Sequence, residues 1–318
     1  MKKKRVIGIV GPTASGKTAL SLPVAKALGA EIVCMDSMQI YRGMDIGTAK
    51  ATPQERAEAV HHMLDVAEPW ENYSVARYVQ EAGAVCDELL AHGVTPILVG
   101  GTGLYIDSLI AGRDFADNRE DGELRRALEA EYDALGGEAM LQKLALFDPE
   151  RAARLEPGDK RRIVRAIEIY KLTGETATAH DARTRALPKR YEAARIVLGY
   201  RERADLYARI DRRVDFMAEA GLFAEVEGLL AAGLSPDCTA MQAIGYKEAV
   251  LALRGELSRE EALHLIRQNS RRYAKRQLTW FKRWEDALPV LFEREPDFEA
   301  ARQASTAFLL RRGYAVCV

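Results

Sequence analysis

A glycine-rich octapeptide near the N-terminus carries the residues most able to do chemistry. It is Gly11-Pro12-Thr13-Ala14-Ser15-Gly16-Lys17-Thr18, with the spacing Gly-x4-Gly-Lys-Thr. Glycines let a backbone curl around an anion, so that successive amide N–H groups point inward as a cradle for phosphate. A lysine adds a mobile positive charge, and a threonine hydroxyl suits Mg²⁺. The octapeptide therefore predicts a phosphate-binding loop (P-loop), with Thr18 as the magnesium ligand.

The segments that flank this loop are those the motif requires. Residues 6–10 are an apolar run typical of a buried strand, and residues 18–28 have the composition of a helix. The start of such a helix adds the positive end of its dipole to the phosphate site. Pro23 lies inside that helix and removes a hydrogen bond, which predicts a kink or a displaced helix start. The loop indicates that phosphate binds, but neither which phosphate nor for what reaction.

Asp36 is the second candidate for chemistry, because it follows another expected strand at residues 31–35. P-loop kinases and NTPases normally carry an apolar strand that ends in an aspartate and orders magnesium. Here the apolar run at residues 96–99 ends in Gly-Gly-Thr instead. Asp36 could cap a following helix. Beside a phosphate site, its carboxylate could also accept a hydrogen bond or a proton from a nucleophile.

The first hundred residues alternate strands and helices, with a further helix expected over residues 73–92. Strands separated by helices predict a parallel sheet. Ligands of such sheets bind at the carboxyl ends of the strands. The P-loop, Asp36 and Thr102 all follow expected strands, so we expect them to meet in one cleft.

The pattern changes after residue 113. Residues 123–135, 139–146 and 159–172 have helical periodicity, and an apolar strand returns at residues 194–200. We therefore expect an α/β fold with a P-loop parallel-sheet core and an inserted all-helical domain. The expected division is 1–113 for the first part of the core, 114–194 for the insertion and 195–318 for a mostly helical second part. A last strand is expected at residues 314–318.

Charge is distributed unevenly along the chain, although its net charge is only −1. Residues 151–213 hold 17 Lys/Arg against 9 Asp/Glu, and residues 267–283 hold seven cations and no acid. Local basic patches are typical of a polyanion partner. Solvated helix faces are the simpler alternative.

The cysteines, histidines and apolar runs argue against several classes of protein. Cys34, Cys86, Cys238 and Cys317 are scattered singly, which argues against a zinc site or a disulfide framework. Of the histidines, only His61 and His62 are neighbours, so a histidine metal site is not expected. No run approaches the roughly 20 apolar residues of a membrane span. Without a signal-peptide pattern, the sequence predicts a cytoplasmic protein with no membrane and no obligate protein partner.

Several motifs follow one another over almost the whole chain. They are residues 11–18 (GPTASGKT), 36–50 (DSMQIYRGMDIGTAK), 61–65 (HHMLD), 100–105 (GGTGLY), 159–168 (DKRRIVRAIE), 209–217 (RIDRRVDFM), 243–248 (AIGYKE) and 276–281 (RQLTWF). Together these segments strongly resemble the tRNA dimethylallyltransferases (tRNA isopentenyltransferases). Asp-Ser-x-Gln-x-Tyr together with Gly-Gly-Thr-x-x-Tyr is far more specific than the P-loop alone.

The resemblance implies a reaction. Dimethylallyl diphosphate would donate its dimethylallyl group to the exocyclic amine of the adenosine 3′-adjacent to the anticodon of a tRNA, and pyrophosphate would leave. The P-loop would then hold a diphosphate leaving group with Mg²⁺. The target base must leave its stack to reach such a cleft.

The resemblance also implies roles for individual residues. Asp36 would accept a hydrogen bond or proton from the adenine amine, Thr13 would contact the reacting centre, and Arg213 would bind the diphosphate. Arg209 is a second diphosphate candidate, because a spacing of four residues puts it on the same helix face. The implied diphosphate site is Gly11, Pro12, Thr13, Ala14, Ser15, Gly16, Lys17, Thr18 and Arg209.

A second group of residues would contact the anticodon stem-loop. Its members nearest the reacting base are Asp36, Ser37, Met38, Gln39 and Thr102. In the insertion they are Arg125, Arg161, Arg162 and Arg165, and beyond it Gln242, Gly245, Tyr246, Lys275, Arg276 and Trp280. Trp280 would stack on a base or, as is commoner for aromatic residues at helical spacing, pack in the core.

Two other functions remain open at this stage. A P-loop kinase of a small molecule or nucleotide would use ATP, but the missing aspartate after residues 96–99 argues against it. A non-catalytic RNA-binding protein with a relic P-loop is also conceivable, but the intact Lys17, Thr18 and Asp36 argue against that.

Overall fold

The chain forms two compact units in its computed structural model, which describes residues 4–113, 115 and 122–315. One unit is built from the segments up to Ile110 and from Arg190 onward, and the other is Ala111–Lys189. Each unit is described by itself below.

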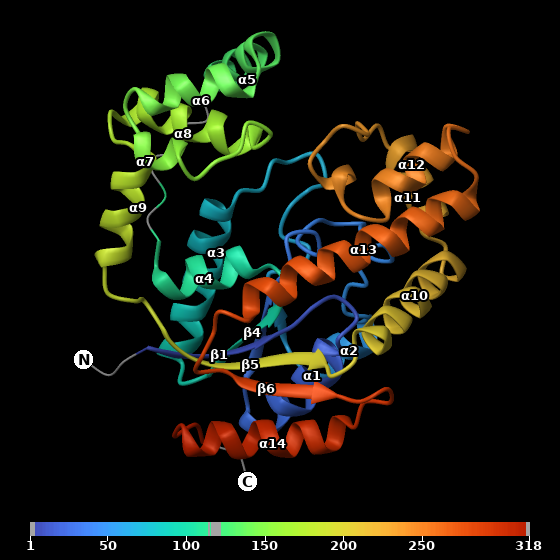
Figure 1. Ribbon diagram of the computed structural model, residues 1–318. Helices are drawn as coiled ribbons and strands as arrows, with labels where there is room; N and C mark the ends of the chain where they lie inside the picture. The colour runs from blue at the N-terminus through green and yellow to red at the C-terminus, as the bar shows by residue number, and fades with distance from the viewer. Residues whose placement is uncertain (1–3, 114, 116–121, 316–318) are drawn as a thin grey trace. The chain divides into compact units, whose positions relative to one another are not determined.

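The first unit is built on a six-stranded sheet in which every pairing is parallel. The strands are β1 (Arg5–Val10), β2 (Glu31–Met35), β3 (His61–His62), β4 (Pro96–Gly100), β5 (Glu192–Tyr200) and β6 (Leu288–Phe292). Their order across the sheet is β3-β2-β4-β1-β5-β6 (Figure 1). This confirms the predicted parallel sheet, and it places the ends of β1, β2 and β4 side by side.

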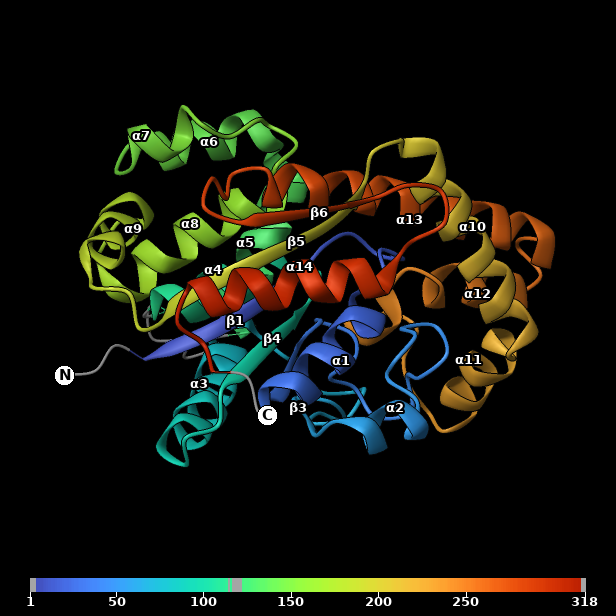
Figure 2. The same cartoon turned by 90° about the horizontal axis from the view of Figure 1, so that it is seen from below.

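Helices cover both faces of this sheet, whereas α11 and α12 pack against other helices. The helices of this unit are α1 (Lys17–Leu28), α2 (Pro53–Glu58), α3 (Val75–Ala91), α4 (Gly103–Ala111), α10 (Arg203–Glu219), α11 (Leu222–Ala231), α12 (Tyr246–Leu253), α13 (Arg259–Phe281) and α14 (Phe298–Arg311). α1 and α14 lie on one face, whereas α3, α4 and α13 lie on the other (Figures 1 and 2). Ile7 and Ile9 of β1 pack with Leu20 of α1 and Leu309 of α14 in a continuous apolar core.

α1 continues through Pro23 as one helix. A proline at this position cannot donate a hydrogen bond to the carbonyl of Ala19. Ala19 is exposed, so water can satisfy that carbonyl and the helix need not break. The predicted alternatives, a kink or a displaced start, are therefore not required.

The second unit contains helices and, among its described residues, no strand. The helices are α5 (Gly122–Leu135), α6 (Gly137–Ala145), α7 (Pro149–Ala152), α8 (Lys160–Thr173) and α9 (Ala177–Ala186). Leu128, Met140, Leu144 and Ile163 form its own small core. The unit ends at Lys189, and β5 begins at Glu192, before the expected position of 194.

The predicted last strand was wrong in its position. Tyr314 and Ala315 are not in a strand, and residues 316–318 lie outside the described part of the chain. The sheet ends instead in β6, which contains Pro289 and exposes 49% of Leu291. A proline is tolerated in an edge strand because no further strand needs its N–H. None of the described helices is long and apolar enough to cross a membrane.

Candidate active site

The P-loop connects β1 to α1 in a conformation that depends on its glycines. A Cβ on Gly11 would lie 2.7 Å from the carbonyl oxygen of Leu198 in the neighbouring strand. Gly16 has a φ of 84° and caps α1 without any side-chain hydrogen bond to the first turn. Any other residue would be strained at that φ. The amides at the start of α1 are thus available to an anion, as the motif predicts.

Lys17 is folded back onto its own loop. Its Nζ donates hydrogen bonds to the carbonyl oxygens of Gly11 at 3.1 Å and Pro12 at 2.9 Å. Burial, and to a lesser degree the positive charge of Arg213, lower the pKa of Lys17 to about 8. An anion bound here would raise this pKa again, because negative charge favours the ammonium form.

A cavity of about 500 Å³ opens beside the P-loop and gathers residues from five parts of the sequence. Its lining includes Thr13, Ala14, Ser15, Gly16, Lys17, Thr18, Asp36, Gln39, Glu55, Arg209, Arg212, Arg213, Tyr273 and Gln277. The structure therefore brings together most of the residues predicted to bind diphosphate and the three catalytic candidates Thr13, Asp36 and Arg213. A second cavity of about 1050 Å³ shares Thr18, Ala49, Glu55 and Arg213 with the first.

Two arginines of α10 reach this cavity from one side of their helix. Arg209 Nε donates to the carbonyl of Ala14, and Arg213 Nη2 donates to the carbonyl of Thr48, both at 3.1 Å. Burial lowers the pKa of Arg213, and the nearby charge of Asp36 opposes that shift. Arg212, which was not among the predicted residues, also lines the cavity. Together with Lys17 they give the cavity a strong preference for an anion.

Asp36 both caps a local backbone segment and faces the phosphate site, the two roles that its sequence context allowed. Its Oδ1 accepts a hydrogen bond from the backbone N–H of Met38 at 2.9 Å, which caps a turn rather than the helix that was considered. Its carboxylate also lines the cavity. Thr102 steadies this turn, since its Oγ1 accepts the N–H of Ser37 at 3.2 Å. Ser37 and Met38 are half-buried beside the cavity but do not line it.

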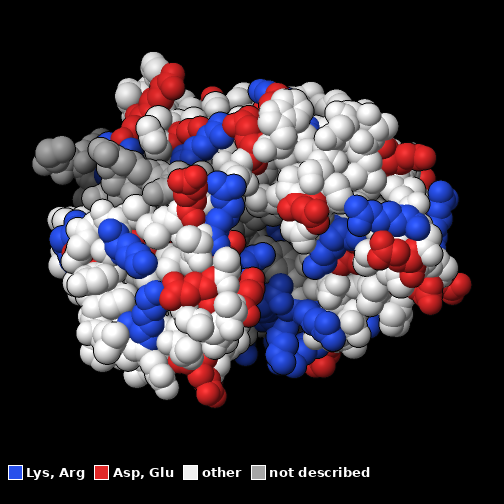
Figure 3. Space-filling view, turned by 90° about the horizontal axis from the view of Figure 1, so that it is seen from above, with Lys and Arg blue, Asp and Glu red and all other residues white. Residues whose placement is uncertain are grey.

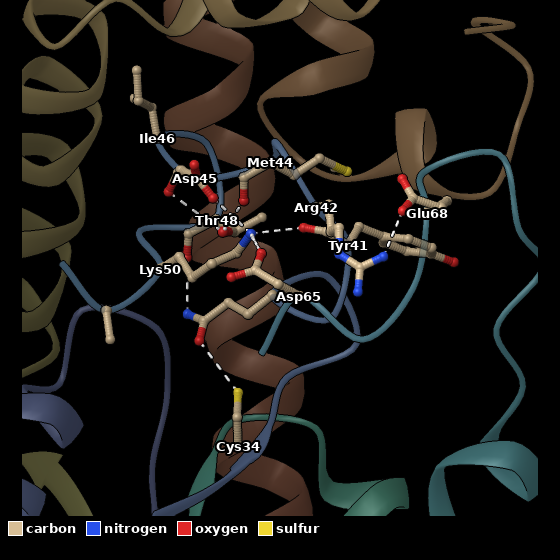
Figure 4. A network of polar contacts seen from close by, with 12 residues as sticks. Cys34, Tyr41, Arg42, Met44, Asp45, Ile46, Thr48, Lys50, Asp65 and Glu68 are labelled. Atoms are coloured by element: carbon tan, nitrogen blue, oxygen red, sulfur yellow. Dashed lines mark hydrogen bonds and ion pairs between the residues drawn. The ribbon is translucent and has the colours of Figure 1, made fainter. Parts of the chain in front are cut away.

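The segment after Asp36 is held by a buried ammonium group (Figure 4). Nζ of Lys50, whose side chain is 1% exposed, lies 2.6 Å from each of Tyr41 O, Asp45 Oδ1 and Asp65 Oδ1. Arg56 binds the other carboxylate oxygen of Asp65 at 2.9 Å. Burial would raise the pKa of Asp65, but hydrogen bonds from Lys50 and Arg56 outweigh it and hold the pKa below its usual range.

This network predicts a pH-dependent loss of stability. We expect Asp65→Asn to lower the free energy of unfolding near pH 7 by about 2–3 kcal/mol, because it removes one partner of a buried charge. A carboxyl group with a depressed folded pKa stabilises the protein above its unfolded pKa of about 4 and loses this effect as pH falls through the folded pKa. Urea unfolding from pH 7 to pH 3 should therefore show the two proteins converging below about pH 4. A constant difference across that range would contradict the assignment.

Gln39 is tied to the same segment. Its Nε2 donates to the carbonyls of Thr48 at 3.1 Å and Ala49 at 3.2 Å, and its Oε1 accepts from Cys34 Sγ at 3.3 Å. The carbonyl of Thr48 is therefore shared by Gln39 and Arg213. The position of Arg213, a candidate for binding the diphosphate, thus depends on the fold of the segment that follows Asp36.

Tyr246, predicted to contact tRNA, is fully buried. Its hydroxyl donates to Glu225 at 2.5 Å, and its ring occupies the space where a Cβ of Gly47 would be. The same Glu225 accepts the backbone N–H groups of Asp45, Ile46 and Gly47. In this structure Tyr246 therefore supports the segment that holds Gln39, and its side chain presents no surface to RNA.

The other predicted tRNA contacts of the first unit are distributed differently. Gly245 is buried, whereas Gln242, Lys275 and Arg276 are exposed. Trp280 packs against Gly103, where a Cβ would clash with its ring, and its Nε1 donates to Asp107 at 2.8 Å. The core alternative is thus the one that the contacts of Trp280 favour.

In the second unit, the predicted arginines fall into two groups. Arg125 and Arg165 bind the carboxylate of Glu168 at 2.8 and 2.7 Å, and Glu168 itself is only 2% exposed. Arg161 is exposed, and Arg162 is 72% exposed with Asp159 at 3.7 Å. Arg125 and Arg165 therefore have a structural task that Arg161 and Arg162 do not share.

Tyr273 and Gln277 line the cavity but were not among the predicted site residues. They come from α13, more than 230 residues after the P-loop. The only sequence signal was the position of Gln277 in the motif at residues 276–281, with Tyr273 one helical turn earlier. Burial, and then the charge of Asp36, raise the pKa of Tyr273 to about 12, so its hydroxyl stays protonated.

Among the described residues, no group of three or more His, Cys, Asp or Glu side chains is arranged to hold a metal ion. A magnesium ion that accompanies a diphosphate does not need such a group, since it keeps several waters and binds mainly through phosphate oxygens. Thr18 lines the cavity at the start of α1 and can supply the single hydroxyl ligand.

Comparison with known proteins places these features in context. A family model described as IPP transferase matches residues 39–284, and one described as Isopentenyl transferase matches residues 4–65. A tRNA dimethylallyltransferase of Halalkalibacterium halodurans is 44% identical over 298 residues, 92% of this chain and 94% of the relative. That of Symbiobacterium thermophilum is 48% identical over 281 residues, 88% of this chain and 87% of the relative.

Solved structures show the same similarity. The tRNA isopentenylpyrophosphate transferase of Bacillus halodurans is 40% identical, with a TM-score of 0.71 over 98% of this chain and 97% of that one. A eukaryotic dimethylallyltransferase acting on tRNA is 27% identical, with a TM-score of 0.82 over 98% of this chain and 81% of that one.

Proposed function

Because this chain belongs to the IPP transferase family, we propose that it is a tRNA dimethylallyltransferase. It transfers the dimethylallyl group of dimethylallyl diphosphate to the exocyclic amine of the adenosine 3′-adjacent to the anticodon, and it releases pyrophosphate. The observation that supports this most is the single cavity that joins the P-loop, Arg209 and Arg213 to Asp36. The ATP-dependent kinase is not favoured, since the similar proteins are named as tRNA dimethylallyltransferases.

The charges in the cavity match what the reaction requires. The bond between the allylic carbon and the diphosphate oxygen breaks, and its electron pair leaves with pyrophosphate. The P-loop amides, Lys17 and Arg213 stabilise that growing negative charge. The amine nitrogen then forms the new bond to carbon and loses one proton, which Asp36 accepts. Holding both reactants in line makes a bimolecular reaction effectively unimolecular, which lowers the entropic part of its barrier.

A divalent metal generally accompanies a diphosphate substrate, and we assign Mg²⁺ to this role with Thr18 as its protein ligand. Bound there, Mg²⁺ would neutralise part of the charge of the diphosphate. Thr18 is well placed for this because it follows Lys17 directly and lines the cavity.

The tRNA substrate is expected to contact exposed Lys and Arg side chains rather than those that form ion pairs with buried carboxylates. Figure 3 shows Lys and Arg in separate groups with Asp and Glu between them, in keeping with a net charge of −1. Arg161, Arg162, Lys275 and Arg276 are exposed, so we propose these as contacts to the anticodon stem-loop. Asp36 and Gln39 line the cavity and Thr102 braces the turn beside it, so we propose that they surround the flipped base.

We expect the double variant Arg161→Ala/Arg162→Ala to weaken tRNA binding and to make its salt dependence shallower. Each lost phosphate contact should reduce the slope of log K against log[salt] by about 0.7–0.9. Titrations with tRNA at several salt concentrations measure this slope. Thr178→Ala in the same unit is not a suitable control, because its hydroxyl binds Asp148. Lys171→Ala on the last turn of α8 is the matched single-charge control.

A slope equal to that of the wild type would remove this end of α8 from the tRNA site. Arg165→Ala should behave differently from the double variant, because it leaves the buried Glu168 with one partner fewer. Its main effect should be a lower free energy of unfolding, by about 1–3 kcal/mol.

The activity itself is tested with unmodified tRNA and labelled dimethylallyl diphosphate, in parallel with ATP. The expected result is label in tRNA at the adenosine beside the anticodon and release of pyrophosphate. Phosphate transfer from ATP without any prenylation would contradict the proposal. Prenylation that persists when that adenosine is replaced by guanosine would contradict the choice of acceptor.

A further inference from the structure

Gln277 of α13 joins two loops of the site through one side-chain amide. Its Oε1 accepts the backbone N–H of Thr13 at 2.8 Å, and its Nε2 donates to the carbonyl of Gly101 at 3.0 Å. The residue is 5% exposed. The loop after β1 and the loop after β4 are thus held at a fixed spacing by a residue that lies far from both in the sequence.

The glycines of the second loop make room for this contact. A Cβ on Gly101 would clash with Nε2 of Gln277, and a Cβ on Gly103 would clash with the ring of Trp280. Gln277 and Trp280 lie three residues apart on one face of α13, and Trp280 is anchored to Asp107 of α4. The motif Gly-Gly-Thr-Gly therefore accommodates α13, whereas no ligand is needed to explain these two glycines.

Both ends of the Gln277 bridge carry residues of the site. Thr13 lines the cavity, and Thr102, next to Gly101, accepts the N–H of Ser37 beside Asp36. Tyr273 lines the cavity one turn before Gln277. A displacement of Gln277 would thus change the spacing between the P-loop and the turn of Asp36.

We propose that Gln277 is a positioning residue for dimethylallyl transfer, whose amide sets the distance between the Thr13 and Thr102 loops so that donor and acceptor meet in line. This inference rests on the proposed function. It requires one acceptor and one donor at this position, because Thr13 offers an N–H and Gly101 a carbonyl. A side chain with neither group, or with two acceptors, cannot hold both loops.

Two variants separate positioning from mere packing. Gln277→Leu removes both polar groups. Gln277→Glu keeps the shape, but its ionised form offers no donor and places a negative charge against the Gly101 carbonyl. Its protonated form restores one acceptor and one donor. Thr279→Ala, an exposed residue on the same helix whose hydroxyl binds only the carbonyl of Lys275, is the control.

At pH 8 we expect both Gln277 variants to lower kcat for transfer by about 10–100-fold, the effect of a misplacement of about 1 Å. The tRNA Kd and the KM for dimethylallyl diphosphate should change by less than about threefold, because the cations of the cavity remain. As pH falls from 8 to 5.5, the kcat of Gln277→Glu relative to wild type should rise several-fold, whereas that of Gln277→Leu should stay flat. Thr279→Ala should match wild type throughout.

At each pH, the kcat of a Gln277 variant is divided by the kcat of wild type. This ratio isolates the effect of residue 277, because the variant and the wild type share all other ionisable groups around the cavity. These are Lys17, Asp36, Glu55, Arg209, Arg212, Arg213 and Tyr273. A Gln277→Leu variant with wild-type kcat would overturn the inference, and so would a Gln277→Glu variant that stays equally impaired at every pH. A wild-type protein that transfers no prenyl group would instead refute the proposed function.

Discussion

Replacing Asp36 with alanine will lower the rate of dimethylallyl transfer by about 10²–10⁴-fold, which is the usual effect of removing a positioned acid or base. Asp36 lines the cavity beside the P-loop and is the acid expected to accept the proton from the adenine amine. Single-turnover transfer with saturating tRNA and donor measures this step directly. The tRNA Kd should change little, because one carboxylate contributes no attraction to a polyanion.

The Asp36→Asn variant separates chemistry from structure. An asparagine can still accept the N–H of Met38 through its carbonyl oxygen, as Asp36 does at 2.9 Å, so the turn is retained. It cannot take up a proton at neutral pH. We therefore expect Asp36→Asn to be nearly as slow as Asp36→Ala while unfolding at the wild-type urea concentration. An asparagine variant with near-normal turnover would show that Asp36 only shapes the turn.

Removing Arg213 will act mainly through the diphosphate. We expect Arg213→Ala to lower kcat/KM for the donor by about 10²–10³-fold, since it removes one donor aimed at charge that grows in the transition state. Lys17→Ala should have a similar effect for the same reason. Binding of inorganic pyrophosphate, measured by calorimetry, should weaken in both variants, and the tRNA Kd should remain within about threefold of wild type.

The variant Arg213→Lys tests whether charge alone is sufficient. Lysine keeps the positive charge, but it has no planar set of donors to bind the carbonyl of Thr48 and an anion together. We expect it to recover pyrophosphate binding in part and transfer only weakly. If either alanine variant lost tRNA binding while keeping pyrophosphate affinity, the residue would have been assigned to the wrong ligand.

The parts of this protein that could be predicted from the sequence depend on neighbouring residues. The P-loop spacing, the apolar runs of β1, β2 and β4 and the position of Asp36 after β2 are local patterns, and the structure contains each of them at the expected place. An alternation of strands and helices also implies a parallel sheet, and hence a common edge for the P-loop and Asp36. The α/β class, the helical second unit and the family follow from such patterns.

Long-range packing decided the features that the sequence did not predict. Gln277 and Tyr273 reach the cavity only because the glycines after β4 leave room for α13. β6 escaped prediction because a proline inside a strand, such as Pro289, is tolerated mainly at a sheet edge, and the edge is known only once the strand order is known.

The sequence by itself thus determined the chemistry that is present: an anion cradle, a carboxylate at a strand end and an excess of cations in two stretches. The tertiary structure decided which of these side chains are available to a ligand and which are engaged within the fold. Arg165 is occupied by the buried Glu168, and Tyr246 is occupied by Glu225, whereas Arg161 remains exposed. The reason is physical, because a buried charge or hydroxyl must find a partner, and the partner is selected by the fold rather than by its distance along the chain.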